Sequence, residues 1–247
     1  MRLMELNGKK VLVTGGGSGI GLGIALALAG EGCRVAIAGR GEKRLREGAA
    51  QFTGQPPILY RACDVSVRDD VTRLFAWLDK EGFLPLDILV TSAGINIARR
   101  RMCELDPADW DRVLAINATG TYNCMYAALP GMRQQRDGLI VSISSIAGKR
   151  AMALGGPAYC ASKFAATALG TAVGLEERPN GIRVTNVYPG EVDTPILEHR
   201  PVPVPPEKRA KMVHPKDIAA CVVTIANLPP RVLVPELVIT PLYQEYA

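Results

Sequence analysis

Short apolar runs alternate with longer amphipathic or alanine-rich stretches along the whole chain. The runs predict strands at residues 10–14, 34–38, 58–64, 86–90, 139–142, 182–187 and 237–239, and the stretches between them predict helices at 20–31, 42–52, 66–80, 107–135 and 158–177. The strands are short, rich in β-branched residues and apolar throughout, which is typical of a parallel sheet covered on both faces. This alternation predicts an α/β fold built on one doubly wound parallel sheet of about seven strands.

The chain shows no internal repeat and no linker long enough to divide it, so residues 1–247 are expected to form a single domain. One biased segment, residues 201–206, contains too many prolines for a helix or a central strand. Two interpretations stay open for this segment. It is either a surface connection or part of a flap over a binding site, a substrate lid of about residues 196–215.

Composition and charge narrow the class of protein. A net charge of +5 is spread along the chain, which suits anionic ligands such as phosphates and is no nucleic-acid footprint. The six cysteines are widely spaced and there are only two histidines, so we expect reduced thiols and no metal site. No apolar run reaches the length of a membrane span, and residues 1–8 lack the apolar region of a secretory signal. We therefore expect a cytoplasmic protein that binds neither membranes nor nucleic acids.

A glycine-rich turn follows the first predicted strand. Residues 14–21 read TGGGSGIG, and the next predicted helix begins at once. Glycines here allow a tight turn and let a pyrophosphate approach backbone N–H groups at the positive end of the helix. The spacing alone is a weak signal in a chain with 25 glycines, but its position between a strand and a helix strengthens it. The turn indicates a dinucleotide phosphate site.

Two further segments carry reactive side chains. Tyr159 and Lys163 are four residues apart on a predicted helix and therefore share a face. A cation near a phenol lowers its pKa, which makes Tyr159 a candidate proton donor and acceptor. Ser142, Ser144 and Ser145 stand at the carboxyl end of the fifth predicted strand, where doubly wound folds bind their ligands.

The order of these motifs resembles the short-chain dehydrogenase/reductase family over almost the whole chain. The matching segments are TGxxxGIG at 14–21, Cys-Asp-Val at 63–65, Ala-Gly-Ile at 93–95, Asn-Ala-Thr-Gly at 117–120, the serines, YxxxK at 159–163, and 189–195. The resemblance implies a Rossmann fold, and 3-oxoacyl-(acyl-carrier-protein) reductases are among the similar members. It also implies a catalytic set of four residues: Asn117, Ser145, Tyr159 and Lys163. Within this set, Asn117 would bend its helix and hold a water that relays protons from Lys163.

The resemblance further implies the contacts of a nicotinamide dinucleotide. The phosphates would face the glycine-rich turn, the adenine the third strand, and the nicotinamide the segment after the sixth strand; the residues implied are Gly15, Ser18, Ile20, Gly21, Asp64, Val65, Ala93, Gly94, Tyr159, Lys163, Pro189, Val192 and Thr194. The end of the second strand decides the choice of cofactor, because NAD-preferring enzymes place a carboxylate there. Gly39 and Arg40 stand at this place, and an arginine suits a 2′-phosphate, so NADP(H) is expected over NAD(H).

Several residues depart from the family pattern or leave alternatives open. Thr91 and Ser92 replace a common Asn-Asn pair, and the spacing of 14 residues between Ser145 and Tyr159 leaves Ser144 as a competitor for the serine role. The arginine run at 99–101 is interpreted either as a solvated loop or as a contact for an anionic substrate or acidic carrier. Arg136 matches a docking base of carrier-protein reductases, whereas Asn180 stands at the matching second position.

These observations predict an NADP(H)-dependent oxidoreductase that interconverts a secondary alcohol and a ketone, with a 3-oxoacyl thioester as one candidate substrate. The first alternative is a catalytically silent NADP(H)-binding sensor, which would not need Tyr159 and Lys163. A Rossmann-like methyltransferase is a third class, and it would not need YxxxK either. The helices near 115–132 and 158–175 carry small and apolar residues all round. Together with the family resemblance, this pattern predicts a homotetramer.

Overall fold

The computed structural model describes residues 6–245, so the prediction for the first residues of the chain lies largely outside the described part. The described residues form one parallel sheet with the strand order β3-β2-β1-β4-β5-β6-β7. Its seven strands are β1 (Lys10–Thr14), β2 (Arg34–Gly39), β3 (Leu59–Ala62), β4 (Ile88–Thr91), β5 (Gly138–Ile143), β6 (Ile182–Pro189) and β7 (Glu236–Ile239). The predicted doubly wound sheet is confirmed.

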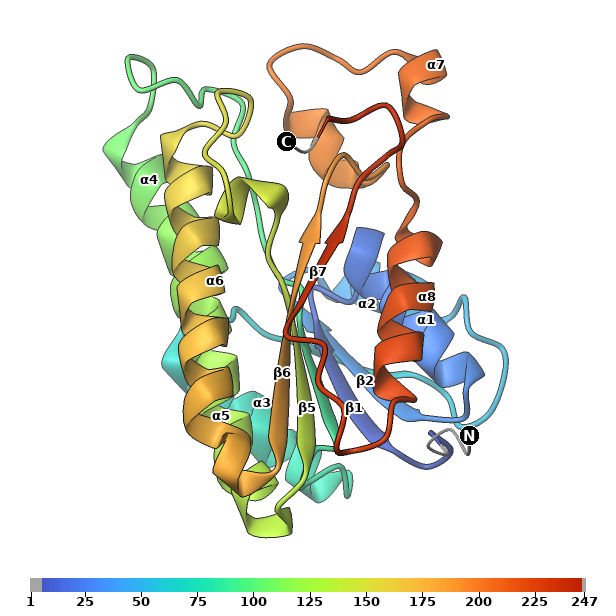
Figure 1. Cartoon of the computed structure of the whole chain (residues 1–247). Coiled ribbons are helices and arrows are strands. Elements are labelled where there is room, and N and C mark those ends of the chain that lie inside the picture. Colours follow the sequence, from blue (N-terminus) through green and yellow to red (C-terminus); the bar gives the residue numbers. More distant parts are fainter. Residues whose placement is uncertain (1–5, 246–247) are drawn as a thin grey trace.

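Two layers of helices cover the sheet, and the apolar side chains of each layer form a separate core (Figure 1). One face carries α1 (Gly19–Gly30), α2 (Glu42–Ala49) and α8 (Pro215–Ala226). The other face carries α3 (Arg68–Lys80), α4 (Pro107–Leu114), α5 (Gly120–Gln135) and α6 (Pro157–Glu177). Because both faces are covered, the inner strands β1, β4, β5 and β6 are buried almost throughout, whereas the edge strands β3 and β7 are partly exposed.

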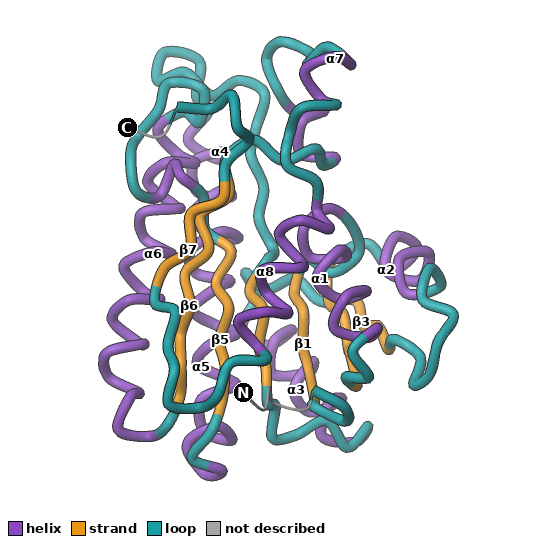
Figure 2. The backbone as a smooth tube through the Cα atoms, turned by 45° about the vertical axis from the view of Figure 1, so that its right-hand side comes forward, coloured by secondary structure: helices purple, strands orange, loops and turns teal. Residues whose placement is uncertain are grey.

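Shorter helical turns connect these elements. They are η2 (Ile146–Gly148), η3 (Arg178–Asn180), η4 (Pro195–His199) and α7 (Pro206–Arg209). Of these, η3 precedes β6 at the amino end of the sheet, and the others lie beyond its carboxyl end. Figure 2 shows α7 beyond the end of the sheet, above α8 and α1. The segment predicted as a substrate lid thus contains η4 and α7, and an isolated bridge between Val192 and Val213 holds its two ends side by side.

Helix α8 was not among the predicted elements. Its buried residues follow a helical spacing, with Ile218, Val222 and Ile225 on the face that packs against the sheet and α1. Its first turn is fixed by Pro215 and by the carboxylate of Asp217, which accepts a hydrogen bond from the backbone N–H of His214 at 2.8 Å. The prolines at 201–206 indicated an irregular segment before it, although proline is compatible with the first turn of a helix.

The long helix predicted at 107–135 is interrupted. It consists of α4, a single π-helical segment η1 (Ala115–Thr119), and α5. Tight packing fixes the far side of the interruption, because a Cβ on Gly120 would lie 2.5 Å from the side chain of Val65. Such wide turns are rare inside α-helices and occur frequently at functional sites.

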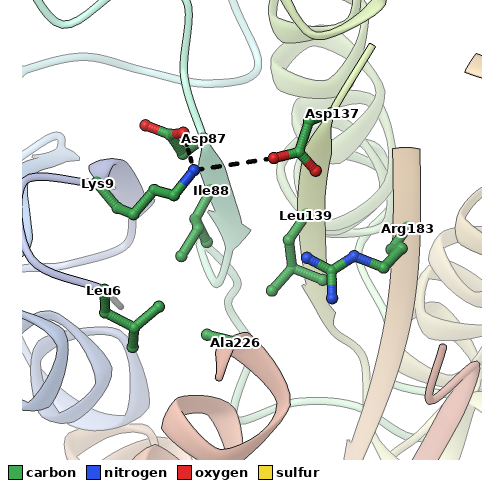
Figure 3. A pocket seen from close by; sticks show the side chains of 8 residues that line it. All are labelled: Leu6, Lys9, Asp87, Ile88, Asp137, Leu139, Arg183 and Ala226. Atoms are coloured by element: carbon green, nitrogen blue, oxygen red, sulfur yellow. Dashed lines mark hydrogen bonds and ion pairs between the residues drawn. The ribbon is translucent and has the colours of Figure 1, made fainter. Parts of the chain in front are cut away.

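The two ends of the sheet differ in character. The chain runs from β1 to β2 and β3 on one side and then crosses to β4 on the other side of β1. The carboxyl ends of β1 and β4 therefore flank the switch point where doubly wound folds bind ligands. At the amino end, Lys9 pairs with Asp87 at 2.7 Å and with Asp137 at 3.8 Å (Figure 3). The cavity beside this pair, which Arg183 also lines, leaves about 10 Å³ of free space, which is about enough for one water.

Candidate active site

The glycine-rich turn after β1 is shaped by close backbone contacts. Gly15 has a φ of +67°, and a Cβ there would lie 2.8 Å from the backbone of Ala93, in the loop after β4. A Cβ on Gly21 would lie 2.4 Å from the carbonyl oxygen of Gly15. Only glycine fits at these two positions, so the turn brings β1, β4 and the start of α1 into direct contact.

The amino end of α1 is open to an anionic ligand. Ser18 occupies the N-cap without a side-chain hydrogen bond to the helix, and no acidic residue lies in the first turn. The first backbone N–H groups of a helix have no intrahelical partners, and the helix dipole is positive at this end. Thr194 stands over the turn, because a Cβ on Gly19 would lie 3.2 Å from its methyl carbon. These features fit the phosphates of a dinucleotide.

The ends of β2 and β3 line the adenosine side of the predicted cofactor site. Arg40 is exposed and makes no hydrogen bond or ion pair within residues 6–245, and a Cβ on Gly39 would meet only Leu45, at 3.6 Å. The Asp64 carboxylate accepts hydrogen bonds from the backbone and hydroxyl of Ser66, at 3.0 and 2.6 Å. The end of β2 therefore presents a free guanidinium and room for a bulky group.

Thr14 takes over part of the support expected from the residues after β4. Its hydroxyl oxygen accepts hydrogen bonds from the backbone N–H groups of Ser92 and Ala93, at 3.2 and 3.3 Å. The buried hydroxyl of Thr91, by contrast, has no hydrogen-bond partner within the described residues. At the place of the family's Asn-Asn pair, Thr91 is therefore buried without a hydrogen bond from its hydroxyl, and Ser92 is held through its backbone N–H.

Asn117 connects the π-helical turn to the loop after β4. Its Oδ1 accepts a hydrogen bond from the backbone N–H of Ile95 at 2.8 Å, and its Nδ2 donates to the Ile95 carbonyl and to Ser162 Oγ, each at 3.0 Å. The side chain lies 1% exposed. A Cβ on Gly94 would lie 3.4 Å from Asn117 Oδ1 and 3.5 Å from Lys163 Nζ. Asn117, Gly94 and Lys163 therefore share one small region.

The structure separates the two serines that the sequence left in competition. Ser144 Oγ hydrogen-bonds the carbonyl of Lys163 at 3.1 Å and Thr167 at 2.9 Å, so it faces the middle of α6. Ser145 accepts a hydrogen bond from the backbone N–H of Ala147 at 3.1 Å, and its side chain also hydrogen-bonds Tyr159. Only Ser145 meets the tyrosine.

The electrostatics of Tyr159 and Lys163 differ from the simple expectation of a cation beside a phenol. Burial raises the pKa of Tyr159, although the hydrogen bond from Ser145 and the charge of Arg100 act in the opposite direction. Burial lowers the pKa of Lys163 to about 8, and its ammonium donates to the Ile143 carbonyl at 2.9 Å. Lys163 Nζ lies 5.8 Å from the centre of the Tyr159 ring. Without a ligand, Tyr159 is thus held as a neutral phenol.

The segment after β6 is tied together by a buried carboxylate, Glu191, whose role the sequence did not indicate. Glu191 lies 8% exposed and pairs with Arg200 at 2.8 Å and with Lys208 at 3.0 Å. It also accepts a hydrogen bond from the Tyr243 hydroxyl at 2.6 Å. These bonds tie two residues of the predicted lid, Arg200 and Lys208, to the segment after β6, where Pro189, Val192 and Thr194 lie. A single acidic residue inside a loop motif gave no signal for this role.

Arg100 also lies at this end of the sheet. It is 6% exposed, and it donates hydrogen bonds to carbonyls of the β4 loop, of the loop before α6, and of η4. Its neighbours Arg99 and Arg101 are exposed. The solvated-loop interpretation of the arginine run therefore holds for two of its members and is wrong for the middle one.

This combination of a parallel doubly wound sheet, an open helix end and a Ser-Tyr-Lys cluster is that of a dinucleotide-dependent oxidoreductase. Residues 9–202 match the family model described as short chain dehydrogenase. The chain therefore belongs to the short-chain dehydrogenase/reductase family and is an oxidoreductase of that family. Among the described residues, no helix is long and apolar enough to cross a membrane.

Individual relatives extend the match to nearly the full length. An uncharacterized oxidoreductase of Staphylococcus saprophyticus is 35% identical over 241 residues, which cover 97% of this chain and 100% of the relative. The structure of an alcohol dehydrogenase from the archaeon Thermococcus sibiricus, complexed with 5-hydroxy-NADP, has a TM-score of 0.85 at 29% identity and covers 97% of this chain and 99% of its own. A 3-ketoacyl-(acyl-carrier-protein) reductase from Brucella melitensis, complexed with NADH, has a TM-score of 0.85 at 26% identity, with coverage of 96% and 98%.

Proposed function

We propose that this oxidoreductase uses NADP(H) to interconvert a secondary alcohol and a ketone on a small molecule. The observation that carries the proposal is the cluster of Ser145, Tyr159, Lys163 and Asn117 beside the glycine-rich turn. When bound, the nicotinamide supplies the hydride for reduction and accepts it in oxidation. A silent sensor protein is not favoured, because the side chains that handle a proton are present and connected.

Each member of the cluster has a distinct role in this proposal. Tyr159 gives its phenolic proton to the carbonyl oxygen during reduction, and the neutral phenol that burial favours is the state this step requires. Ser145 donates a hydrogen bond to the same oxygen and so orients it. Lys163 holds the nicotinamide ribose and stabilises the phenolate that remains. Asn117 holds the loop with Ile95 in place and binds the water that relays a proton from Lys163.

Replacement of the phenol tests this mechanism. Tyr159→Phe keeps the ring but removes the proton, so turnover should fall by about 10²- to 10⁴-fold, while the Kd of NADPH should change little. The measurement is NADPH oxidation at the nicotinamide absorbance with a panel of ketones, sugars and acyl thioesters. Tyr60→Phe, on β3 and outside the cluster, is the matched control. A Tyr159→Phe enzyme that keeps more than about a tenth of wild-type turnover contradicts the mechanism.

The preference for NADP(H) rests on the end of β2. The exposed Arg40 guanidinium is free to contact a 2′-phosphate, and Gly39 leaves room for it. A hydrogen bond to a charged group contributes about 1.5–3 kcal/mol, so Arg40→Ala should weaken NADPH binding by roughly 10- to 150-fold and leave NADH almost unchanged. Gly39→Asp should go further, because its carboxylate repels the phosphate and suits the ribose hydroxyls of NADH.

The measurement is the ratio of kcat/KM for NADPH over NADH in the wild type and in both variants. Arg46→Ala, an exposed arginine on α2, is the control for the loss of a positive charge. A wild-type enzyme that prefers NADH, or a ratio that Arg40→Ala does not move, would show that Arg40 is only a solvated surface charge.

Two finer parts of the proposal concern substrate and assembly. A 3-oxoacyl thioester stays among the candidate substrates, but Arg136 donates to the Pro179 carbonyl at 2.7 Å and Asn180 to Glu177 at 2.8 Å, which gives little support to a docking site for an acidic carrier. The proposed homotetramer is supported by α5 and α6, which expose large apolar side chains: Tyr122, Tyr126, Phe164 and Leu175. The cytoplasmic location stays part of the proposal.

A further inference from the structure

Arg100 is a buried cation held by dipoles alone. Its Nε donates to the Ile97 carbonyl at 2.8 Å, its Nη1 to the Leu154 carbonyl at 3.0 Å, and its Nη2 to the His199 carbonyl. Within residues 6–245 it forms no ion pair with a carboxylate. Buried arginines are normally paired with an anion, because an uncompensated charge away from water is costly.

The surroundings of Arg100 add positive charge and do not remove it. Burial lowers the pKa of Arg100, and the positive charge of Arg200, the residue after His199, lowers it further by repulsion. The Glu191 carboxylate is engaged by Arg200, Lys208 and the Tyr243 hydroxyl. One carboxylate thus faces two cations before Arg100 is counted. Asp193 pairs with Arg209 in the same way, so the carboxylates that follow β6 are already engaged by cations of the predicted lid and are not paired with Arg100.

Arg100 is placed beside the reacting groups. The loop that it binds through Leu154 leads directly into α6, whose first turn carries Tyr159. A Cβ on Gly156 would lie 2.4 Å from the backbone oxygen of Arg100, so the two segments are in contact. The positive charge of Arg100 also acts on the Tyr159 phenol and lowers its pKa, against the larger effect of burial. A guanidinium has five N–H groups, and the three carbonyls use three of them. One N–H on each terminal nitrogen is left for a ligand.

We propose that Arg100 binds the carboxylate of the substrate, and that the substrate is an oxo acid or the corresponding hydroxy acid. This inference rests on the proposed function. In the reduction, hydride adds to the ketone carbon, the carbonyl oxygen takes the Tyr159 proton, and the carboxylate is unchanged. A carboxylate has two oxygens that can accept hydrogen bonds from these N–H groups, and it would supply the anion that Arg100 lacks among the described residues. A bound carboxylate would also stabilise the three loops whose carbonyls hold Arg100.

The test compares oxo acids with their uncharged methyl esters. The wild-type kcat/KM with NADPH is measured for 2-, 3-, 4- and 5-oxo acids and for each ester. We expect the acid to exceed the ester at one chain length or more. Arg100→Gln should lower the acid-over-ester ratio by about 10- to 150-fold, the effect of one hydrogen bond to a charged group. Arg99→Gln and Arg101→Gln, exposed neighbours in the same run, should leave the ratio unchanged.

Loss of the loop contacts in Arg100→Gln could lower all activities, so the ratio and a second variant carry the argument. Arg100→Lys keeps the charge and should retain more of the acid preference than Arg100→Gln. Two results would overturn the proposal: a wild-type enzyme that reduces esters or thioesters better than acids at every chain length, or an Arg100→Gln ratio equal to that of the wild type. Either result would assign Arg100 to loop positioning only.

A binding measurement separates this proposal from the proposed function. The Tm of the wild type with NADP⁺ is measured with butanoate and with butanamide, which differ in charge but cannot be reduced. A larger Tm rise with butanoate that disappears in Arg100→Gln supports the carboxylate site even if no ketone is turned over. Equal shifts for both compounds contradict it, even if neutral ketones are reduced rapidly.

Discussion

Removal of the Asn117 side chain tests the link between the π-helical turn and the loop after β4. The Asn117 amide satisfies both backbone groups of Ile95 and also hydrogen-bonds Ser162. In Asn117→Ala the Ile95 N–H and C=O lose these partners, at about 1–3 kcal/mol for each buried group left unpaired. Ile95 is only half-buried, so water can replace part of the loss. We therefore expect a destabilisation of about 2–3 kcal/mol.

Thermal unfolding of the protein without ligands measures this effect. For a chain of this size, 1 kcal/mol shifts the Tm by about 2–4 °C, so Asn117→Ala should lower it by roughly 4–12 °C at a fixed protein concentration. Asn123→Ala is the matched control on α5. Asn123 is equally buried, but its Nδ2 makes one hydrogen bond, to the Val65 carbonyl at 2.9 Å, and its Oδ1 has no partner among the described residues.

The control variant should lose about 1 kcal/mol, because one hydrogen bond is removed and an unpaired oxygen is removed with it. If Asn117→Ala unfolds at the same temperature as Asn123→Ala or above it, the Asn117 amide does not hold the loop. A loss of turnover without a change in Tm would also contradict the structural part of the argument and would leave only the proton relay.

The remaining predictions concern ionisation and assembly. Burial lowers the folded-state pKa of Lys163 to about 8, so the unfolded chain binds this proton more tightly than the folded one. The difference in Tm between the ligand-free wild type and Lys163→Met should therefore rise from pH 8 to pH 10. A difference that does not change with pH would refute the shift. Light scattering should report a tetramer at micromolar concentration. Tyr126→Glu, in the exposed aromatic pair of α5, should dissociate it, whereas a monomeric wild type would exclude the proposed assembly.

The order of strands and helices was predictable because each strand is an apolar run bounded by turn residues. Helix α8 was missed because its first residue, Pro215, follows a proline-rich loop, and because its apolar positions pack against α1, which is distant in the sequence. The π-helical turn was not predictable as such. Asn117 within this turn hydrogen-bonds Ile95, 22 positions earlier in the chain, and such a distant contact leaves no local pattern in the sequence.

The candidate site divides in the same way into local and distant causes. The four-residue spacing of Tyr159 and Lys163 places both on one helix, but burial, which no local pattern reveals, decides the direction of both pKa shifts. Ser144 and Ser145 are adjacent and chemically identical. They follow the end of β5, and Ser145 has an extended backbone; successive residues of extended chain point to opposite sides, so one serine meets the middle of α6 and the other meets Tyr159.

The arginine run at 99–101 shows where local information ends. Its three residues have the same side chain and nearly the same sequence neighbours, yet Arg100 is 6% exposed while Arg99 and Arg101 face solvent. The difference arises because three loops, from β4, from the turn before α6 and from η4, each direct a carbonyl at one point. Carbonyls can hold a guanidinium but cannot neutralise it. An anion is therefore the missing component of this arrangement, and the carboxylate of a substrate supplies it at the place where selectivity is needed.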